Sequence, residues 1–364
     1  MSTSSPDPDK PNCPYLPDLE VDISTHTAPL PFGGGMYPLG SYPWRKEKWL
    51  YSVTQTTHVI THPPLETPPS VQENTVRLVV TKSLAIGNAR GAQVLLCSII
   101  PYGEGEKTFE AVAKIYDPLY YPPFSEIGSY PLDVVGDADE DYSKEAAAYK
   151  CLERAGQTGL FAPAFFGSWT FSFPTSYKQE IHQRKIRLIL IEYIPGICMR
   201  DLFVQNGLNQ INATHLSEEY RLEVLAILLD GVAKQCHAGV DQRDLSPRNV
   251  IITPPPKPKE TRPQRVVLID YNISTVYELT EYGKRPSQLA KLPPNPMELF
   301  WTASLSDLAG WVPPGLCYDR RLQQEWLRSE FGGEKKVLYE PLEKELKLHE
   351  TPPEELAVMQ YLGS

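Results

Sequence analysis

The sequence predicts an α+β fold in which an antiparallel sheet lobe comes first and a mainly helical lobe follows. Three observations support this prediction. Short segments with the apolar pattern of strands are concentrated between residues 76 and 194. The longest segment with helical apolar spacing comes later, from Ser217 onward. Hydrophobic residues make up 41% of the 364-residue chain, which is enough for a buried core. We expect a cleft between the two lobes.

Proline is the main feature of the first part of the chain. The chain contains 36 prolines, and residues 1–70 are rich in them. Proline fixes φ and has no amide hydrogen, so regular elements are hard to build there. We therefore expect a Pro-rich extension over residues 1–70 that is largely irregular or disordered. The sheet lobe is expected over residues 76–195 and the helical lobe over residues 196–364.

Four strands and one helix are expected in the sheet lobe. The strand over Phe109–Tyr116 alternates so that Lys114 and Tyr116 share one face. The helix over Ser143–Ala155 is rich in Ala, Leu, Glu and Lys and ends before Gly156. An insertion rich in Pro, Tyr and acidic residues, residues 117–141, precedes this helix, and we expect its acidic residues in a solvated loop. The other strands are expected at Val76–Lys82, Ala92–Ile100 and Arg187–Ile194.

The helical lobe begins with the longest predicted helix. Ser217 is a suitable N-cap for it, and the residues that recur at helical spacing are Leu222, Leu225, Leu228, Leu229 and Val232. Two short apolar strands follow, Val250–Ile252 and Val266–Ile269, with a proline-rich loop between them. The tail, Arg320–Ser364, is expected to be helical and charged.

The composition narrows the range of partners and compartments. A formal net charge of −10 makes general nucleic-acid binding unexpected, because an acidic surface repels phosphate backbones. The six cysteines form no C-x-x-C pair, which favours reduced thiols in a reducing compartment. The N-terminus lacks the pattern of a signal peptide, and no segment approaches the roughly 20 apolar residues that span a bilayer. We expect an intracellular, cytoplasmic protein without a membrane partner, and a nuclear location stays open.

Three polar side chains accompany the short strands of the second half. Asp244 and Asn249 are five positions apart on the loop before the first strand, and Asp270 follows the second. A magnesium-dependent phosphoryl transfer needs hard oxygen ligands that hold the metal against the nucleotide phosphates. It also needs a carboxylate that orients the attacking hydroxyl and accepts its proton. Neighbouring strand ends are expected to present these two carboxylates and the amide to one small volume.

This stretch resembles the protein-kinase family. Arg243, Asp244 and Asn249 match the spacing of the catalytic loop H-R-D-x-x-x-x-N, and Asp270-Tyr-Asn stands in place of Asp-Phe-Gly. The resemblance covers about residues 76–311, and the segment D-L-S-P-R-N is similar to divergent kinase-like proteins of fungi. It implies an α+β, bilobal protein-kinase-like fold with an N-terminal antiparallel β lobe. The C-terminal, mainly helical lobe is expected to be reduced after the D-Y-N motif.

The resemblance also implies roles for individual residues around ATP and Mg²⁺. Asp244 is the expected catalytic base, and Asn249 and Asp270 are the expected metal ligands. The segment Ala-Val-Ala-Lys that ends at Lys114 resembles V-A-I-K, whose lysine contacts the nucleotide phosphates, and Glu145 is its expected ion-pair partner. The remaining expected nucleotide contacts are Gly87 and Gly91 in the glycine loop, and Glu192 and Ile194 in the segment that resembles the adenine-binding hinge.

Departures from the family pattern leave alternatives open. The glycine-rich loop is reduced to Gly87-Asn-Ala-Arg-Gly91, Ser246 stands where serine/threonine kinases have lysine, and Asn272 replaces a glycine. One interpretation is an active phosphotransferase that transfers the γ-phosphate of ATP to a hydroxyl acceptor. This acceptor is a protein, or a small molecule as in aminoglycoside and choline kinases. The other interpretation is an inactive or weak pseudokinase that serves as a binding module.

Overall fold

The computed structural model describes residues 7–34, 36–38, 42–68, 74–88, 90–103, 105–125, 127, 130–205, 210–256 and 262–349. Parts of four predicted segments lie outside these residues: 1–6, 35, 39–41 and 69–70 of the extension, 126 and 128–129 of the acidic insertion, 257–261 of the proline-rich loop and 350–364 of the tail. The chain forms two compact units. Unit 1 comprises Met1–Gly159, Pro163–Tyr193 and Asp270–Gly283, and unit 2 comprises Leu160–Ala162, Ile194–Ile269 and Lys284–Ser364. Each unit is described separately.

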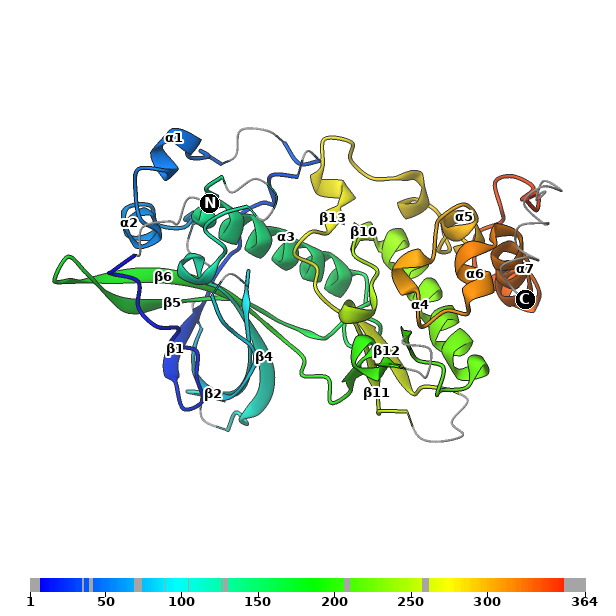
Figure 1. Cartoon of the computed structure of the whole chain (residues 1–364), viewed down its shortest axis with the longest axis horizontal. Coiled ribbons are helices and arrows are strands. Elements are labelled where there is room, and N and C mark those ends of the chain that lie inside the picture. The colour runs from blue at the N-terminus through cyan, green and yellow to red at the C-terminus, as the bar shows by residue number, and fades with distance from the viewer. Residues whose placement is uncertain are drawn as a thin grey trace. The chain divides into compact units, whose positions relative to one another are not determined.

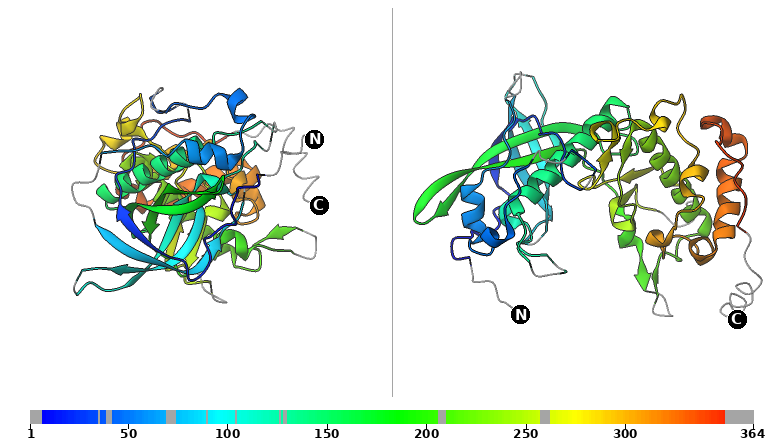
Figure 2. Two further views of the ribbon diagram at one scale, coloured as in Figure 1. Left: turned by 90° about the vertical axis from the view of Figure 1, so that its left-hand side faces the viewer. Right: turned by 90° about the horizontal axis from the view of Figure 1, so that it is seen from above.

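Unit 1 is built on a closed barrel of six antiparallel strands (Figure 1). Their order is β1–β2–β3–β4–β6–β5, and their bounds are β1 Glu20–Thr25, β2 Thr75–Ala85, β3 Gln93–Pro101, β4 Phe109–Tyr116, β5 Phe165–Tyr177 and β6 Glu180–Ile191. β1 closes the barrel because it pairs on both sides: Ile23 lies opposite Val76 of β2, and Thr25 lies opposite Trp169 of β5. The long β5–β6 hairpin extends beyond the other strands (Figure 2).

The predicted bilobal protein-kinase-like fold is wrong. The predicted strands near residues 76, 92, 109 and 187 are confirmed as β2, β3, β4 and β6, but the sheet that they join closes on itself. Two strands of the barrel were missed. β1 lies in the Pro-rich extension, where the proline count favoured irregular structure, and β5 alternates from Trp169 to Tyr177 but contains Pro174, which argues against a strand. Helices and strands are also not divided between the halves, since helices occur in unit 1 and a sheet occurs in unit 2.

The longest helix of unit 1 is α3, Val134–Arg154, which packs against β4, β5 and β6. It begins nine residues before the predicted helix, with Asp133 as N-cap accepting a hydrogen bond from the amide of Gly136. The acidic residues expected in a solvated loop therefore lie on the first half of this helix, and Asp139 is only 2% exposed. Aspartate and glycine have low helix propensity, so this part of the helix was not predicted from the sequence.

A segment of the N-terminal extension, residues 28–44 as far as described, runs along α3, and we call it the strap. Phe32, Tyr42 and Trp44 form an aromatic cluster, with the Phe32 and Tyr42 rings stacked 4.9 Å apart. The cluster packs on the helix at Gly136, where a Cβ atom would lie 2.5 Å from the Trp44 ring. Two short helices, α1 Glu47–Leu50 and α2 Gln55–Thr61, follow the strap.

The other end of the strap holds the chain that follows Asp270. The hydroxyl of Tyr37 donates to the carbonyl of Ser274 at 3.2 Å and accepts from the amide of Val276 at 2.9 Å. Val276 belongs to the short strand β13, Thr275–Val276, which leads into a 3₁₀ turn at Tyr277–Leu279. The Pro-rich extension thus provides ordered contacts to α3 and to the 270–283 segment of the same unit.

Unit 2 is organised around α4, Glu218–Ala238, which confirms the predicted long helix. Ser217 caps its N-terminus, and Gly239 ends it in the left-handed conformation with φ +90°. A three-stranded sheet, β12–β11–β7, contains the two predicted short strands, with bounds Arg265–Leu268, Val250–Thr253 and Ile197–Cys198. The remaining short elements are β8 Val204–Gln205, β9 Ile211–Asn212, β10 Val240–Asp241, α5 Pro296–Phe300, α6 Pro314–Tyr318 and α7 Arg320–Phe331. In the described residues, no helix is both long and apolar enough to cross a membrane.

Candidate functional site

Lys114, Glu145 and Asp270 meet in unit 1, and we call them the Lys114 cluster. The Lys114 ammonium lies 2.5 Å from Oε2 of Glu145 and 2.5 Å from Oδ1 of Asp270. β4 supplies the lysine, α3 supplies the glutamate, and the aspartate follows β12 in the chain. Three residues that are 31 and 156 positions apart therefore form one buried ionic group.

The three side chains of the Lys114 cluster differ in how far solvent reaches them. Glu145 is completely buried and Lys114 is 11% exposed, whereas Asp270 keeps 39% of its side chain exposed. Burial alone lowers the pKa of Lys114, but the carboxylates of Asp270 and Glu145 outweigh it and raise the pKa above the usual value. The lysine is therefore a fixed positive charge, and the aspartate is the member of the cluster that solvent reaches.

Glu145 is held by more than the lysine. Tyr116, two positions after Lys114 on the same face of β4, donates its hydroxyl to Oε2 at 2.7 Å. The backbone amide of Tyr271 donates to Oε1 at 3.2 Å. A fully buried carboxylate needs this number of partners to offset its lost hydration. Sequence reasoning placed Tyr116 on the correct face but assigned it no role.

The turn that begins at Asp270 has an unusual backbone. Asp270 has φ +66°, a left-handed conformation that aspartate tolerates better than most residues. The next residue, Tyr271, is completely buried and packs edge-on against Tyr149 with ring centroids 5.1 Å apart. The buried ring anchors the turn in the unit, so the conformation of Asp270 is determined by packing as well as by its own preference.

Asp244 and Asn249 meet in unit 2, on a loop that we call the Asp244 loop, residues 242–249. The side-chain amide of Asn249 donates to the backbone carbonyl of Asp244 at 3.0 Å and to its Oδ2 at 2.8 Å. Arg248 donates to the same Oδ2 at 2.6 Å. Both contacts to the carboxylate fall on Oδ2, and Oδ1 of Asp244 has no partner among the described residues.

Gln242 ties the Asp244 loop to the end of strand β12. Its Oε1 accepts from the amide of Asp244 at 2.8 Å, and its Nε2 donates to the carbonyl of Ile269 at 3.1 Å. Ile269 in turn donates its amide to the carbonyl of Asn249 at 2.8 Å. The chain then continues directly into Asp270. This role of Gln242 could not be predicted, because hydrogen bonds from a side-chain amide to backbone groups leave no pattern in the sequence.

The amide of Gly87 in the expected glycine loop is not free to bind phosphate. The amide of Gly87 donates to Oε1 of Gln93 at 2.8 Å, and Nε2 of Gln93 donates back to the carbonyls of Gly87 and Gly91. Gln93 is completely buried, so it holds the β2–β3 connection from within. Ala89, in the middle of the loop, lies outside the described residues.

The two expected hinge residues belong to different units. Glu192 lies in unit 1 and uses Oε2 to accept the amide of Ala164 at 2.9 Å. Ile194 begins unit 2, is 6% exposed, and accepts the amide of Gly196 at its carbonyl. The assignment of both residues to adenine stays a prediction.

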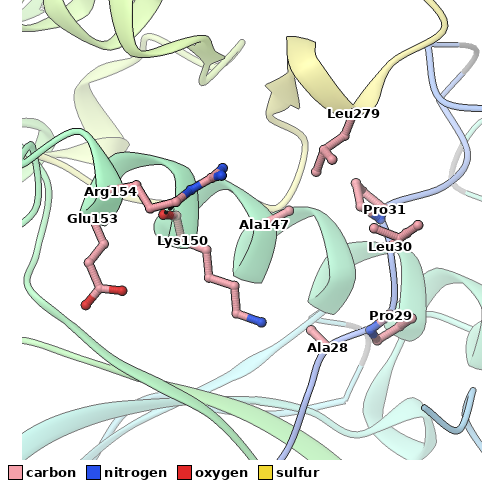
Figure 3. Close-up of a pocket in the computed structure, with 9 residues that line it drawn as sticks. All are labelled: Ala28, Pro29, Leu30, Pro31, Ala147, Lys150, Glu153, Arg154 and Leu279. Carbon is pink, nitrogen blue, oxygen red and sulfur yellow. Dashed lines mark hydrogen bonds between the residues drawn. The ribbon is translucent and has the colours of Figure 1, made fainter. Parts of the chain in front are cut away.

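A cavity of unit 1 is separate from these residues. It has a volume of about 400 Å³ and is lined by the strap, the second half of α3 and Leu279 (Figure 3). Its charged residues are Lys150, Glu153 and Arg154, and the strap supplies only apolar residues, among them Leu30. None of the predicted site residues lines it, so it gives no evidence about the predicted site.

A metal site made of protein side chains alone is not apparent in the described residues. No group of three or more His, Cys, Asp or Glu side chains there is arranged to hold an ion. In unit 1 the candidate ligand is the partly exposed carboxylate of Asp270, and in unit 2 it is the amide oxygen of Asn249, whose nitrogen is bonded to Asp244. Each is a hard oxygen ligand of the kind that Mg²⁺ takes together with phosphate oxygens and water.

Comparison with known proteins does not assign the chain to a family. No protein-family model matches the chain, and no curated protein matches it.

Proposed function

We propose that the chain transfers the γ-phosphoryl group of ATP to a hydroxyl acceptor in a Mg²⁺-dependent reaction. The observation that carries the proposal is the Lys114 cluster. A buried lysine held between two carboxylates is a fixed cation that suits phosphate oxygens, and the partly exposed Asp270 beside it suits a metal. Bound Mg²⁺ supplies charge neutralisation on the phosphates, and the protein supplies the positions of the groups.

The Lys114 cluster also explains how the lysine can release one partner. With both carboxylates bound, the group carries one positive and two negative charges. If Asp270 served as a metal ligand, Lys114 would keep Glu145 as its ion-pair partner and would have its remaining N–H donors available for phosphate. Glu145 stays in place because Tyr116 and the Tyr271 amide also bind it.

The Asp244 loop is the proposed site of the second requirement of the reaction, a base for the acceptor hydroxyl. Asp244 is the proposed base: it accepts the proton of the acceptor hydroxyl while the new O–P bond forms and the bond to the leaving ADP breaks. Arg248 and Asn249 bind Oδ2 and leave Oδ1 for the hydroxyl. The loop is rigid through Gln242, and rigid placement of a base is what general base catalysis requires.

Thermal stability with ATP and Mg²⁺, added singly and together, tests the binding half of this proposal. A ligand that binds only the native state raises the unfolding free energy, by about 2.7 kcal/mol at a hundredfold excess over its dissociation constant. We expect a shift that needs both ATP and Mg²⁺ and that Asp270→Asn abolishes. Glu180→Gln, at a side chain 80% exposed on the β5–β6 hairpin, is the control. No shift in the wild type at millimolar ATP would overturn the proposal.

Phosphoryl transfer is tested separately by ADP release with protein and small-molecule hydroxyl acceptors. Asp244→Asn is expected to keep the thermal shift and to lose turnover, because the amide keeps the shape of the side chain but accepts no proton. Equal turnover in Asp244→Asn and the wild type would remove Asp244 as the base.

The second candidate function is nucleotide binding without transfer. One observation favours it: Gln93 occupies the amide of Gly87, so the β2–β3 connection offers less support to the phosphates than a free glycine loop. This candidate predicts the same Mg²⁺-dependent thermal shift without ADP release for any acceptor. Sustained turnover that depends on Asp244 would exclude it.

A further inference from the structure

Helix α3 places two carboxyl groups against the turn that contains Asp270. Glu145 binds the amide of Tyr271, and Asp141, one helical turn earlier, accepts a hydrogen bond from Nδ2 of Asn272 at 3.2 Å. Two consecutive residues of the turn are therefore tied to one face of one helix. Tyr121 also donates its hydroxyl to Asp141, at 3.0 Å, which fixes the carboxyl group from the other side.

We propose that Asp141 and Asn272 are positioning residues that hold the carboxylate of Asp270 in the geometry that binds Mg²⁺. This inference rests on the proposed function and deepens it. Asp270 itself is in the left-handed region, and for a residue other than glycine this conformation costs about 1–2 kcal/mol. The bonds on Tyr271 and Asn272, directly after it, help to offset that cost, together with the bond of Asp270 to Lys114 and the buried ring of Tyr271.

The identity of residue 272 supports this role. A glycine there would supply backbone freedom but no side chain, whereas Asn272 supplies an amide that reaches Asp141. Asn272 is paired with Asp141, a partly buried residue of α3 that lies beside the β2–β3 connection. A Cβ atom on Gly91 would lie 3.7 Å from Oδ2 of Asp141 and 3.9 Å from the Tyr121 ring. The pair thus links the turn, the helix and the glycine connection of unit 1.

The hydrogen bond of the pair ties α3 to the turn, whereas Lys114 is bonded to Glu145 and Asp270. The charge of Asp141 also attracts Lys114, so Asn272→Ala, which leaves that charge in place, is the variant that isolates the hydrogen bond. Loss of the Asp141–Asn272 bond should therefore leave the lysine fixed and loosen Asp270. We therefore expect variants without this bond to need more Mg²⁺ while their affinity for the nucleotide phosphates stays the same.

The test measures the Mg²⁺ concentration that gives half of the thermal shift at saturating ATP. Asp141→Ala and Asn272→Ala are each expected to raise it about tenfold or more, with the full shift at saturating Mg²⁺ unchanged. Asp141→Asn keeps an acceptor oxygen for Asn272 and should stay within about threefold of the wild type. Glu140→Ala is the matched control, since this neighbouring carboxylate binds Lys144 and not the turn.

The outcomes separate this inference from the proposed function. If the wild type gives no Mg²⁺-dependent shift, the proposed function fails. If the wild type responds but Asp141→Ala and Asn272→Ala need no more Mg²⁺, the positioning role is wrong. A merely structural role would lower the melting temperature of the variants without changing their Mg²⁺ requirement. Asn272→Ala, on an irregular turn, keeps the test available if Asp141→Ala does not fold.

Discussion

At the scale of single residues, the positive charge of Lys114 compensates the negative charge of the buried Glu145 carboxylate. Glu145 is completely buried, and its partners are one ammonium, one hydroxyl and one backbone amide. Two neutral donors do not replace a cation in a medium of low polarity. The stability of unit 1 therefore depends on Lys114 even without any ligand.

Lys114→Met should lower the free energy of unfolding by about 3–5 kcal/mol, because it leaves a buried carboxylate without its cation. The double variant Lys114→Met, Glu145→Gln should recover most of this loss, since the neutral glutamine can still bond Tyr116 and Tyr271. Urea unfolding followed by tryptophan fluorescence measures both values. A single variant within about 1 kcal/mol of the wild type would show that the ion pair is not needed for stability.

The sequence was most informative where residue type and spacing agreed over a short distance. Lys114 and Tyr116 share a face because the strand alternates, and Asp244 and Asn249 meet because one loop carries both. Asp141 was missed because the helix was predicted to begin two residues after it, so its one-turn relation to Glu145 stayed hidden. Gln242 and Gln93 bond backbone groups, and hydrogen bonds to backbone leave no pattern in a sequence.

At the scale of elements, the errors have one common cause: segments with poor intrinsic propensity are held by tertiary contacts. β1 lies in a proline-rich region, yet pairing with both β2 and β5 satisfies its backbone on two sides. The first half of α3 is rich in aspartate, yet the strap and α2 cover it. Propensity is a weak predictor where packing decides, and it cannot show that a sheet closes.

The contact between the strap and α3 gives a prediction whose sign distinguishes packing from propensity. Gly136→Ala should stabilise an isolated helix by about 1 kcal/mol. In this protein, the new Cβ would lie 2.5 Å from the Trp44 ring and 2.9 Å from the Tyr42 ring, so we expect a net loss of about 1–3 kcal/mol.

The control for this prediction is the same substitution in a background that carries Tyr42→Ala and Trp44→Ala. There the clash is absent, and Gly136→Ala should become stabilising. Urea unfolding of the four proteins gives both differences. A stabilising effect of Gly136→Ala in the wild type would mean that the strap does not pack on the helix.

At the scale of the whole molecule, the formal net charge of −10 counts every carboxyl group as ionised. Burial raises the pKa of Asp137, Asp139 and Asp141 to about 7, so these three are partly protonated at neutral pH. All three lie on α3 within one and a half turns. The acidity of the molecule and the stability of this helix are therefore coupled through pH.

The sign of the coupling follows from where each state binds the proton. Asp139 has a pKa of about 7 in the folded chain and 3.8 as the reference value, so between these pH values the folded chain binds the proton and the unfolded chain does not. This contribution to stability is complete below pH 3.8 and is lost as the pH rises toward 7. Burial lowers the pKa of His26 to about 4, which acts in the opposite direction, so the wild-type curve alone is ambiguous.

Asp139→Asn isolates the contribution of this carboxyl group. The asparagine keeps an oxygen that accepts the amide of Leu65, now bonded to Asp139 at 2.7 Å, but it has no charge to bury. The stability of the variant relative to the wild type should therefore rise from pH 5 to pH 8. Glu180→Gln, on the exposed hairpin, should show no such trend. Urea unfolding at four pH values measures the difference, and a variant that loses stability relative to the wild type as the pH rises would show that Asp139 is ionised in the folded protein.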